Sequence, residues 1–317
     1  MSNVLFRIGM LIAVCSSFLT GQQTWGGSYL SLDVANDVFY LPIKTDQYFT
    51  SGISLELGKQ EAGRSPFRQL GLATRTQYWR FTQNIFTPRE IISQQLQAND
   101  RPFASYLVAT RGKTYTDEDL GFHLGRSITI GVLGKYSGGG NMQNAFHEMV
   151  GFADPLPGWI NEVKPDAIVN YRLEIRQAFR PAGRVSLTTG VVARLGTLHT
   201  DMTTALQLRL VAIKRNEHRF LTFKLSGDAR LVGYNATLTG GLINRDERYF
   251  GIIRPTRIVG QAGFEGALNY DVLELRGGIR HLSREFDGGL SHAWAWIGIT
   301  VMPGWQSIKD SRRNNRL

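Results

Sequence analysis

Apolar and polar side chains alternate with a period of two in many segments of this sequence. Leu206, Leu208 and Leu210, for example, alternate with Gln207 and Arg209. Successive side chains of an extended strand point to opposite faces, so this pattern predicts strands with one apolar and one charged face. A soluble β-sandwich turns the charged face outward, whereas a membrane barrel turns it into the lumen. The alternation alone fits both folds.

The length of the alternating segments favours the membrane barrel. Many extend over about a dozen residues, whereas strands in soluble proteins average about five or six. Apart from the N-terminus, no window reaches the roughly eighteen continuous apolar residues that a membrane helix needs. We expect strands near residues 28–38, 48–58, 74–86, 102–113, 118–135, 167–180, 184–196, 203–214, 218–234, 256–269, 271–285 and 290–302.

The connections between these strands differ in length on the two sides. Short connections follow even-numbered strands, at 113–119, 181–184, 214–218 and 269–271. Long connections follow odd-numbered strands, near 87–101, 136–166 and 235–255. Short periplasmic turns opposite long extracellular loops are typical of outer-membrane barrels. The sequence therefore predicts an all-β fold, a transmembrane antiparallel β-barrel of about twelve strands, although the linker at 59–73 is longer than this rule expects.

The two ends of the chain are expected to lie outside the barrel. Residues 1–21 carry the positive charge of Arg7 near their start, continue with an apolar stretch and end in small residues, as a secretory signal peptide does. Lipid attachment at Cys15 is the alternative, but Val14 stands where a small residue is needed. The barrel then covers 22–305, and 306–317 form a basic tail.

The net charge and the cysteine content limit the classes of partner and the kinds of stabilisation that we expect for this chain. An exported protein rarely meets nucleic acid, so the net charge of +10 points to phosphorylated glycolipid headgroups instead. If Cys15 leaves with the signal peptide, the mature chain has no cysteine and no disulfide. A closed ladder of strands would then stabilise it. We expect a monomer in the outer membrane of a Gram-negative bacterium.

Three polar segments map to the same rim of the predicted barrel. They contain Asn36 and Asp37, then Thr50, Ser51 and Gly52, and finally Gln143, Asn144 and His147 on an expected short helix of the third extracellular loop, at 136–166. Strand parity turns Asp37, Thr50 and Gly52 toward the lumen, and turns Asn36 outward unless the strand end redirects it. Taken singly, an Asn-Asp pair is usually turn chemistry, and a single loop histidine is usually incidental.

Together, a carboxylate, an amide, a hydroxyl and an imidazole at one rim can assemble a hydrolytic site. The sequence has no Gly-x-Ser-x-Gly elbow, which argues against a Ser-His-Asp triad. It has no histidine pair at ligand spacing, which argues against zinc. Oxygen ligands from Asp37 and loop carbonyls suit Ca²⁺ better.

Several short motifs, taken in order, resemble the outer-membrane lipid A 3'-O-deacylases. The motifs are Ala35-Asn36-Asp37, Thr50-x-Gly52, Asp100-Arg101-x-Phe103, Gly131-Val132-x-Gly134, Gly138-Gly139-Gly140, Gln143-Asn144-x-x-His147 and Gly151. The resemblance implies a twelve-stranded barrel that hydrolyses the ester of the 3'-acyloxyacyl chain of lipid A with calcium. The site would then face the extracellular leaflet, where this glycolipid resides.

The resemblance also implies roles for individual residues. His147 is expected to be the general base that activates water, and Asp37 to hold Ca²⁺. Asn36 and Thr50 complete the catalytic set by orienting water or substrate. The supporting or substrate-binding residues are expected to be Gly52, Arg101, Gln143 and Asn144.

The sequence departs from the family pattern at two places. The Lys-Arg pair that the family carries in the second extracellular loop for substrate phosphate has no clear match, and this chain has Arg89 upstream and Gln94-Gln95 nearer the expected place. An acidic residue expected after the histidine falls near Ala153, beside Asp154. A glycolipid with fewer phosphates is therefore a reasonable substrate.

Two other classes of protein remain open. A non-enzymatic pore or structural barrel would keep the fold without turnover. Charged lumen residues argue against a wide channel, namely Arg172, Glu174, Arg176, Arg209, Arg276 and Arg280. A phospholipase-type barrel would use a serine nucleophile beside its histidine, and Ser51 is the serine that tests this reading.

Overall fold

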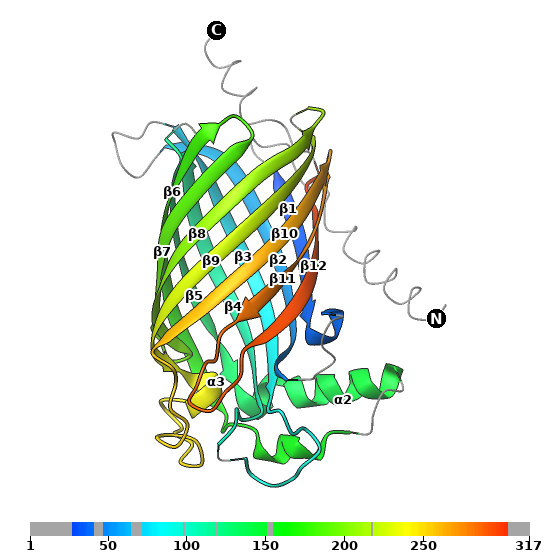
Figure 1. The fold of residues 1–317 in the computed structure, drawn as a ribbon, viewed down its shortest axis with the longest axis vertical. Coiled ribbons are helices and arrows are strands. Elements are labelled where there is room, and N and C mark those ends of the chain that lie inside the picture. The colour runs from blue at the N-terminus through cyan, green and yellow to red at the C-terminus, as the bar shows by residue number, and fades with distance from the viewer. Residues whose placement is uncertain are drawn as a thin grey trace.

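The computed structural model describes residues 27–40, 47–64, 72–97, 99–117, 120–150, 155–216 and 218–303. Twelve antiparallel strands pair with their sequence neighbours, and β1 pairs with β12 to close the barrel (Figure 1). The predicted fold class is confirmed. The strands are β1 (Ser28–Asn36), β2 (Tyr48–Arg64), β3 (Leu72–Thr87), β4 (Ala104–Asp117), β5 (Phe122–Leu133), β6 (Asp166–Ala182), β7 (Val185–Gly196), β8 (His199–Lys214), β9 (Arg219–Asn235), β10 (Ile258–Tyr270), β11 (Leu273–Leu282) and β12 (His292–Val301).

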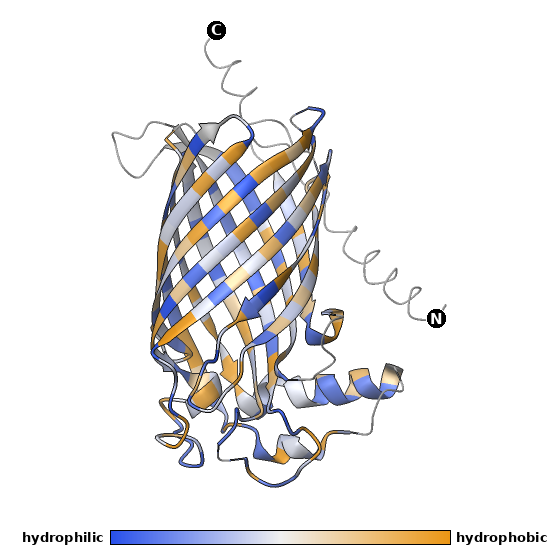
Figure 2. Cartoon of the chain, viewed as in Figure 1, coloured by the Kyte–Doolittle hydropathy of each residue, from blue (hydrophilic) through white to orange (hydrophobic). Residues whose placement is uncertain are grey.

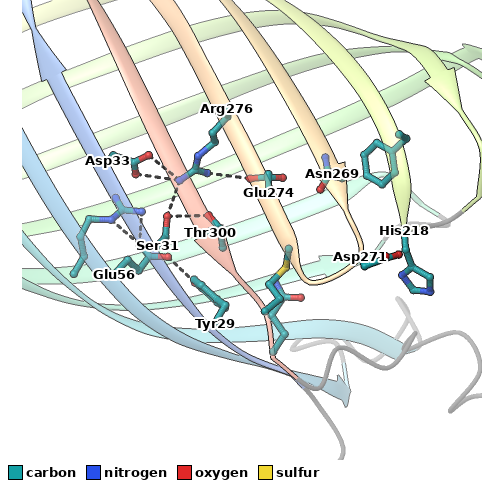
Figure 3. A pocket seen from close by; sticks show the side chains of 14 residues that line it. Tyr29, Ser31, Asp33, Glu56, His218, Asn269, Asp271, Glu274, Arg276 and Thr300 are labelled. Atoms are coloured by element: carbon teal, nitrogen blue, oxygen red, sulfur yellow. Dashed lines mark hydrogen bonds and ion pairs between the residues drawn. The ribbon is translucent and has the colours of Figure 1, made fainter. Parts of the chain in front are cut away.

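Alternation of side chains gives the barrel its two faces (Figure 2). Leu206, Leu208 and Leu210 on β8 are all exposed on the outer face. Intervening polar residues face the lumen, where they pair with charges from other strands. Arg276, for example, donates to Asp33 at 2.8 Å and lies 3.4 Å from Glu274 (Figure 3). An apolar outer face over a paired, charged interior is the arrangement of a membrane barrel.

The two ends of the barrel carry different connections. At the turn end, drawn at the top of Figure 1, the described connections are short, at 118–121, 183–184, 215–218 and 271–272. At the opposite loop end, long connections at 88–103, 134–165 and 236–257 carry most of the helices. Between β7 and β8, however, the loop end has only Thr197 and Leu198.

The predicted linker at 59–73 is largely strand. β2 continues to Arg64 and β3 begins at Leu72, with Arg64 opposite Leu72 in the ladder. The expectation of an unusually long linker was therefore wrong, because the ladder continues where the apolar alternation stops. The remaining linker, 65–71, lies outside the described residues, as do the predicted signal peptide and most of the predicted tail.

No helix in the described part of the chain is long and apolar enough to cross a membrane.

A plug fills the barrel at the loop end. It contains α3 (Ala236–Thr239), all four residues of which are buried. Apolar side chains from the loops pack here against lumen-facing residues of the strands. This core comprises Tyr48, Ala104, Tyr106, Val108, Leu133, Val163, Ile168, Leu198, Ala236, Leu238, Tyr249, Ile253 and Phe286. The lumen between the plug and the turn end is polar, with cavities of about 760 Å³ and about 430 Å³.

Arg101 lies in the middle of this plug with 1% of its surface exposed. Its guanidinium forms an ion pair with Glu285 and donates to Thr237 Oγ1 at 2.6 Å. It also lies 4.1 Å from the ring centroid of Phe86. Burial alone would raise the pKa of the Glu285 carboxyl, but Arg101 and then His292 outweigh it and hold that pKa below its ordinary value. Arg101 therefore joins three loop-end segments.

Candidate active site

The first predicted segment ends β1 at the loop end. Asn36 keeps the extended backbone of β1 and pairs with Ser51 and Ala295, while its Oδ1 accepts a hydrogen bond from Val38 N at 2.8 Å and caps the short helix η2 (Asp37–Phe39). Asp37 is 4% exposed, and its two carboxylate oxygens accept hydrogen bonds from Val38 N at 2.8 Å and Gln47 N at 3.1 Å. A buried carboxylate is thereby fixed in one orientation.

The second segment contains a β-bulge at Thr50. The ladder between β2 and β3 shifts register between Phe49 and Ser51, so Thr50 is the extra residue. Thr50 is buried, and its hydroxyl lies 2.8 Å from that of Thr87. Ser51 is the cross-strand partner of Asn36. The bulge therefore changes the direction of the Thr50 side chain beside the end of β1. Bulges are common next to active sites, where they redirect a side chain in this way.

Gly52 leaves room for a polar contact between neighbouring strands. A Cβ atom at this position would lie only 2.6 Å from Asn84 Oδ1. Asn84 in turn donates from Nδ2 to the hydroxyl of Tyr106 at 2.5 Å. Gly52 supports the site through the space that it leaves, and any larger residue would displace Asn84.

The third segment forms the predicted helix, α2 (Gly139–Val150), which projects sideways at the loop end (Figure 1). Its start is packed on the barrel wall, because a Cβ atom at Gly139 would lie 2.2 Å from Ser105 Cβ. Gln83 Nε2 also donates to Ser137 O at 2.7 Å, just before the helix. These contacts fix the root of α2 on β3 and β4.

Two amides hold the middle of α2 to the loop that follows it. Gln143 Oε1 accepts a hydrogen bond from Trp159 Nε1 at 3.1 Å, on η4 (Pro157–Asn161). Asn144 Oδ1 accepts one from Leu156 N at 3.0 Å. Both residues therefore support the helix, and Gln143 is 5% exposed.

His147 lies one turn beyond Gln143 on the same helix face, because residues four apart are neighbours on a helix. The imidazole is half-buried. Its Nδ1 is shielded from solvent and has no hydrogen-bond partner among the residues described, and the same holds for Gln143 Nε2. Buried polar atoms are normally paired, so these two indicate a place for water, an ion or substrate.

The structure thus places the predicted residues in two groups at one end of the barrel. Asn36, Asp37, Thr50 and Gly52 lie together on the β1–β2 pair, while Gln143, Asn144 and His147 lie on α2. Both groups lie at the loop end of the barrel, and their assembly into one catalytic site stays a prediction. Arg101 belongs to the plug, and Ala153 and Asp154 lie outside the described residues.

Sequence reasoning missed a polar cluster at the root of α2. The hydroxyl of Ser105 lies 2.6 Å from that of Ser137 and donates to Glu162 Oε1. Burial raises the pKa of Glu162 to about 7, despite the hydrogen bonds from Ser105 that lower it. Glu162 follows Ser105 by 57 residues, so no local motif signals the contact.

A closed barrel with an apolar outer belt, a plugged loop end and a polar rim is an outer-membrane β-barrel protein. Its family follows from comparison with known proteins. Residues 7–302 match the model of the family described as outer membrane protein LpxR, and the chain belongs to that family.

Two solved structures resemble this chain to different degrees. LpxR from Salmonella typhimurium is 18% identical and has a TM-score of 0.68, with 86% of this chain and 99% of that chain covered. This likeness shows a shared fold. The β-domain of the Bordetella autotransporter BrkA is 11% identical with a TM-score of 0.49, covering 88% of this chain and 100% of that one. No curated protein matches the chain.

Proposed function

We propose that this protein is an outer-membrane esterase that hydrolyses the 3'-linked acyl or acyloxyacyl chain of lipid A. The observation that carries the proposal is the shielded Nδ1 of His147, which has no hydrogen-bond partner among the described residues, at the loop end of an LpxR-family barrel. A general base needs a ring nitrogen whose lone pair can accept a proton from water.

The hydrolysis would proceed by attack of water on the ester carbonyl carbon. His147 would take the proton of that water at Nδ1 and later return it to the departing alcohol oxygen. The products are a free fatty acid and a free hydroxyl on the glycolipid. Asn36 and Thr50 would orient the water or the ester by hydrogen bonds.

The oxygen atoms around Asp37 are of the chemical types that bind calcium. Ca²⁺ prefers carboxylate, amide and carbonyl oxygens, and Asp37 and Asn36 present such atoms at the end of β1. Within the described residues, no group of three or more His, Cys, Asp or Glu side chains could hold a metal. We expect backbone carbonyls of the loops to complete the ligand set. When bound, calcium would polarise the ester carbonyl and stabilise the charge that develops on its oxygen.

The test is mass spectrometry of lipid A from cells that express the wild type, His147→Ala or His218→Ala, with and without a calcium chelator. His218 lies at the turn end and is the matched control. We expect loss of one 3'-linked acyl group with the wild type and with His218→Ala only, and no loss after chelation. An unchanged lipid A in cells with correctly inserted protein would contradict the proposal.

Two alternative functions make different predictions. A phospholipase-type barrel with Ser51 as nucleophile would lose activity in Ser51→Ala, whereas the water mechanism tolerates this change. A pore would conduct ions in planar bilayers. The plug, with Leu238 only 1% exposed inside the barrel, favours the enzyme over the pore.

A further inference from the structure

Tyr48 has an unusual backbone conformation at the start of β2. Its φ angle is +69°, and among the described residues the only other non-glycine residue with positive φ is Asp271. Asp271 lies in a tight turn between β10 and β11, where Asp commonly adopts this conformation. A bulky aromatic residue rarely does, and such outliers persist only where their surroundings impose them.

The side chain of Tyr48 supplies that constraint. It is 1% exposed, and its ring packs edge-on against Phe286 and His292, with centroids 5.5 Å and 5.3 Å away. Its hydroxyl accepts a hydrogen bond from Leu290 N at 3.1 Å. The three partners come from the β11–β12 loop and the first residue of β12. Tyr48 is therefore anchored in the plug.

The strained backbone lies between two predicted site residues. The preceding amide, Gln47 N, donates to Asp37 Oδ2 at 3.1 Å. The bulged residue Thr50 follows two positions later. A change of φ at Tyr48 would rotate Gln47 relative to β2 and move its N–H away from the Asp37 carboxylate.

We propose that Tyr48 is a positioning residue for Asp37. Its ring, held in the plug, fixes the left-handed backbone that aims Gln47 N–H at the carboxylate, and so orients Asp37 toward calcium and substrate. This inference rests on the proposed function, because only a working site requires that orientation. A residue that merely fills the core would have no reason to keep a positive φ.

The experiment compares Tyr48→Phe, Tyr48→Gly and Tyr48→Ala in deacylation by the full-length, membrane-inserted protein. Phe keeps the ring, so we expect it to stay within roughly two-fold of the wild type. Gly adopts positive φ without strain, whereas Ala does not. We therefore expect Tyr48→Gly to exceed Tyr48→Ala in kcat/KM by roughly ten-fold. If Tyr48 only fills the core, Tyr48→Gly should instead have the lower kcat/KM, because both substitutions remove the ring and glycine also makes the backbone more flexible.

Hydrogen exchange of the Gln47 amide gives a second readout that needs no activity. Exchange should speed up more in Tyr48→Ala than in Tyr48→Gly, because both variants lose the ring but only glycine adopts positive φ without strain. If the wild type fails to deacylate but this order holds, the proposed function is wrong, and what stands is that Tyr48 positions the Gln47 amide against the Asp37 carboxylate. Should either variant fail to insert, Tyr48→Asn and Tyr48→Leu repeat the comparison, since Asn enters the left-handed region readily. Protection equal in the two variants, or lower in the glycine variant, overturns the inference.

Discussion

Replacing Arg101 with Met should loosen the plug without unfolding the barrel. The change keeps a long apolar side chain beside Phe86 but removes the cation that pairs with Glu285. The side chains of Arg101 and Glu285 are 1% and 11% exposed, so water cannot replace the lost partner easily. Breaking a buried pair by removing one member costs about 3–5 kcal/mol, because an uncompensated charge stays buried.

Arg89→Met is the matched control for this prediction. Arg89 also pairs with a carboxylate, that of Asp100 at 3.4 Å, but its side chain is 47% exposed, and the buried Asp100 keeps hydrogen bonds from the backbone N–H groups of Arg89 and Arg101 when the guanidinium is removed. Exposed pairs contribute about 0–1 kcal/mol. The difference between the two variants should therefore exceed about 2 kcal/mol.

Hydrogen exchange in detergent micelles can measure this local loss. Local opening of the plug exposes the amides of 236–239, and their exchange should accelerate roughly a hundred-fold or more in Arg101→Met. Amides of β8 and β9, which belong to the barrel ladder, should keep their protection. Adding Glu285→Gln to Arg101→Met should restore much of the protection, because it removes the unpaired charge. Equal exchange in the Arg101 and Arg89 variants, or no recovery in the double variant, would refute the reasoning.

Three further predictions concern pH, calcium and permeation. Because burial raises the pKa of Glu162 to about 7, the stability that its neutral form contributes is complete at low pH and lost as pH rises through that value. The melting temperature of the wild type should therefore fall relative to Glu162→Gln between about pH 5 and pH 8, and parallel curves would contradict this. Asp37→Asn should raise the calcium concentration for half-maximal deacylation roughly ten-fold or more, and an unchanged calcium dependence would argue against Asp37 as a ligand. Leu238→Glu should open the plug and give conductance steps in planar bilayers that the wild type lacks, whereas steady wild-type conductance would contradict the sealed barrel.

The strands could be predicted from sequence because the lipid belt imposes alternation on each of them. The prediction ended β2 too early, at residue 58, because residues 59–64 are mostly polar and lack the alternation. There, Glu61 pairs with Lys59 at 2.6 Å and with Arg75. The hydrogen-bonded ladder continues beyond the lipid, but the apolar signal ends with it.

Only the part of the site that follows from strand order could be predicted from the sequence. Strand order alone brings Asp37, Thr50 and the third loop to the same end of the barrel. The contact between Ser105 and Glu162 and the backbone strain at Tyr48 depend on packing between segments far apart in the chain. Neither leaves a periodic or local signal, so only the folded structure reveals them.

The seam between the first and last strands links the proposed chemistry to biogenesis. β1 joins β12 through seven residue pairs, from Leu30–Val301 to Asn36–Ala295, and Asp37 follows directly after the last pair. The residues that hold Tyr48 also come from the last hairpin of the chain. A polypeptide on its way to the membrane, with its two terminal strands still apart, would lack an organised catalytic end. Hydrolysis would then begin only after insertion is complete, which would spare glycolipids that the unfinished chain meets during transport.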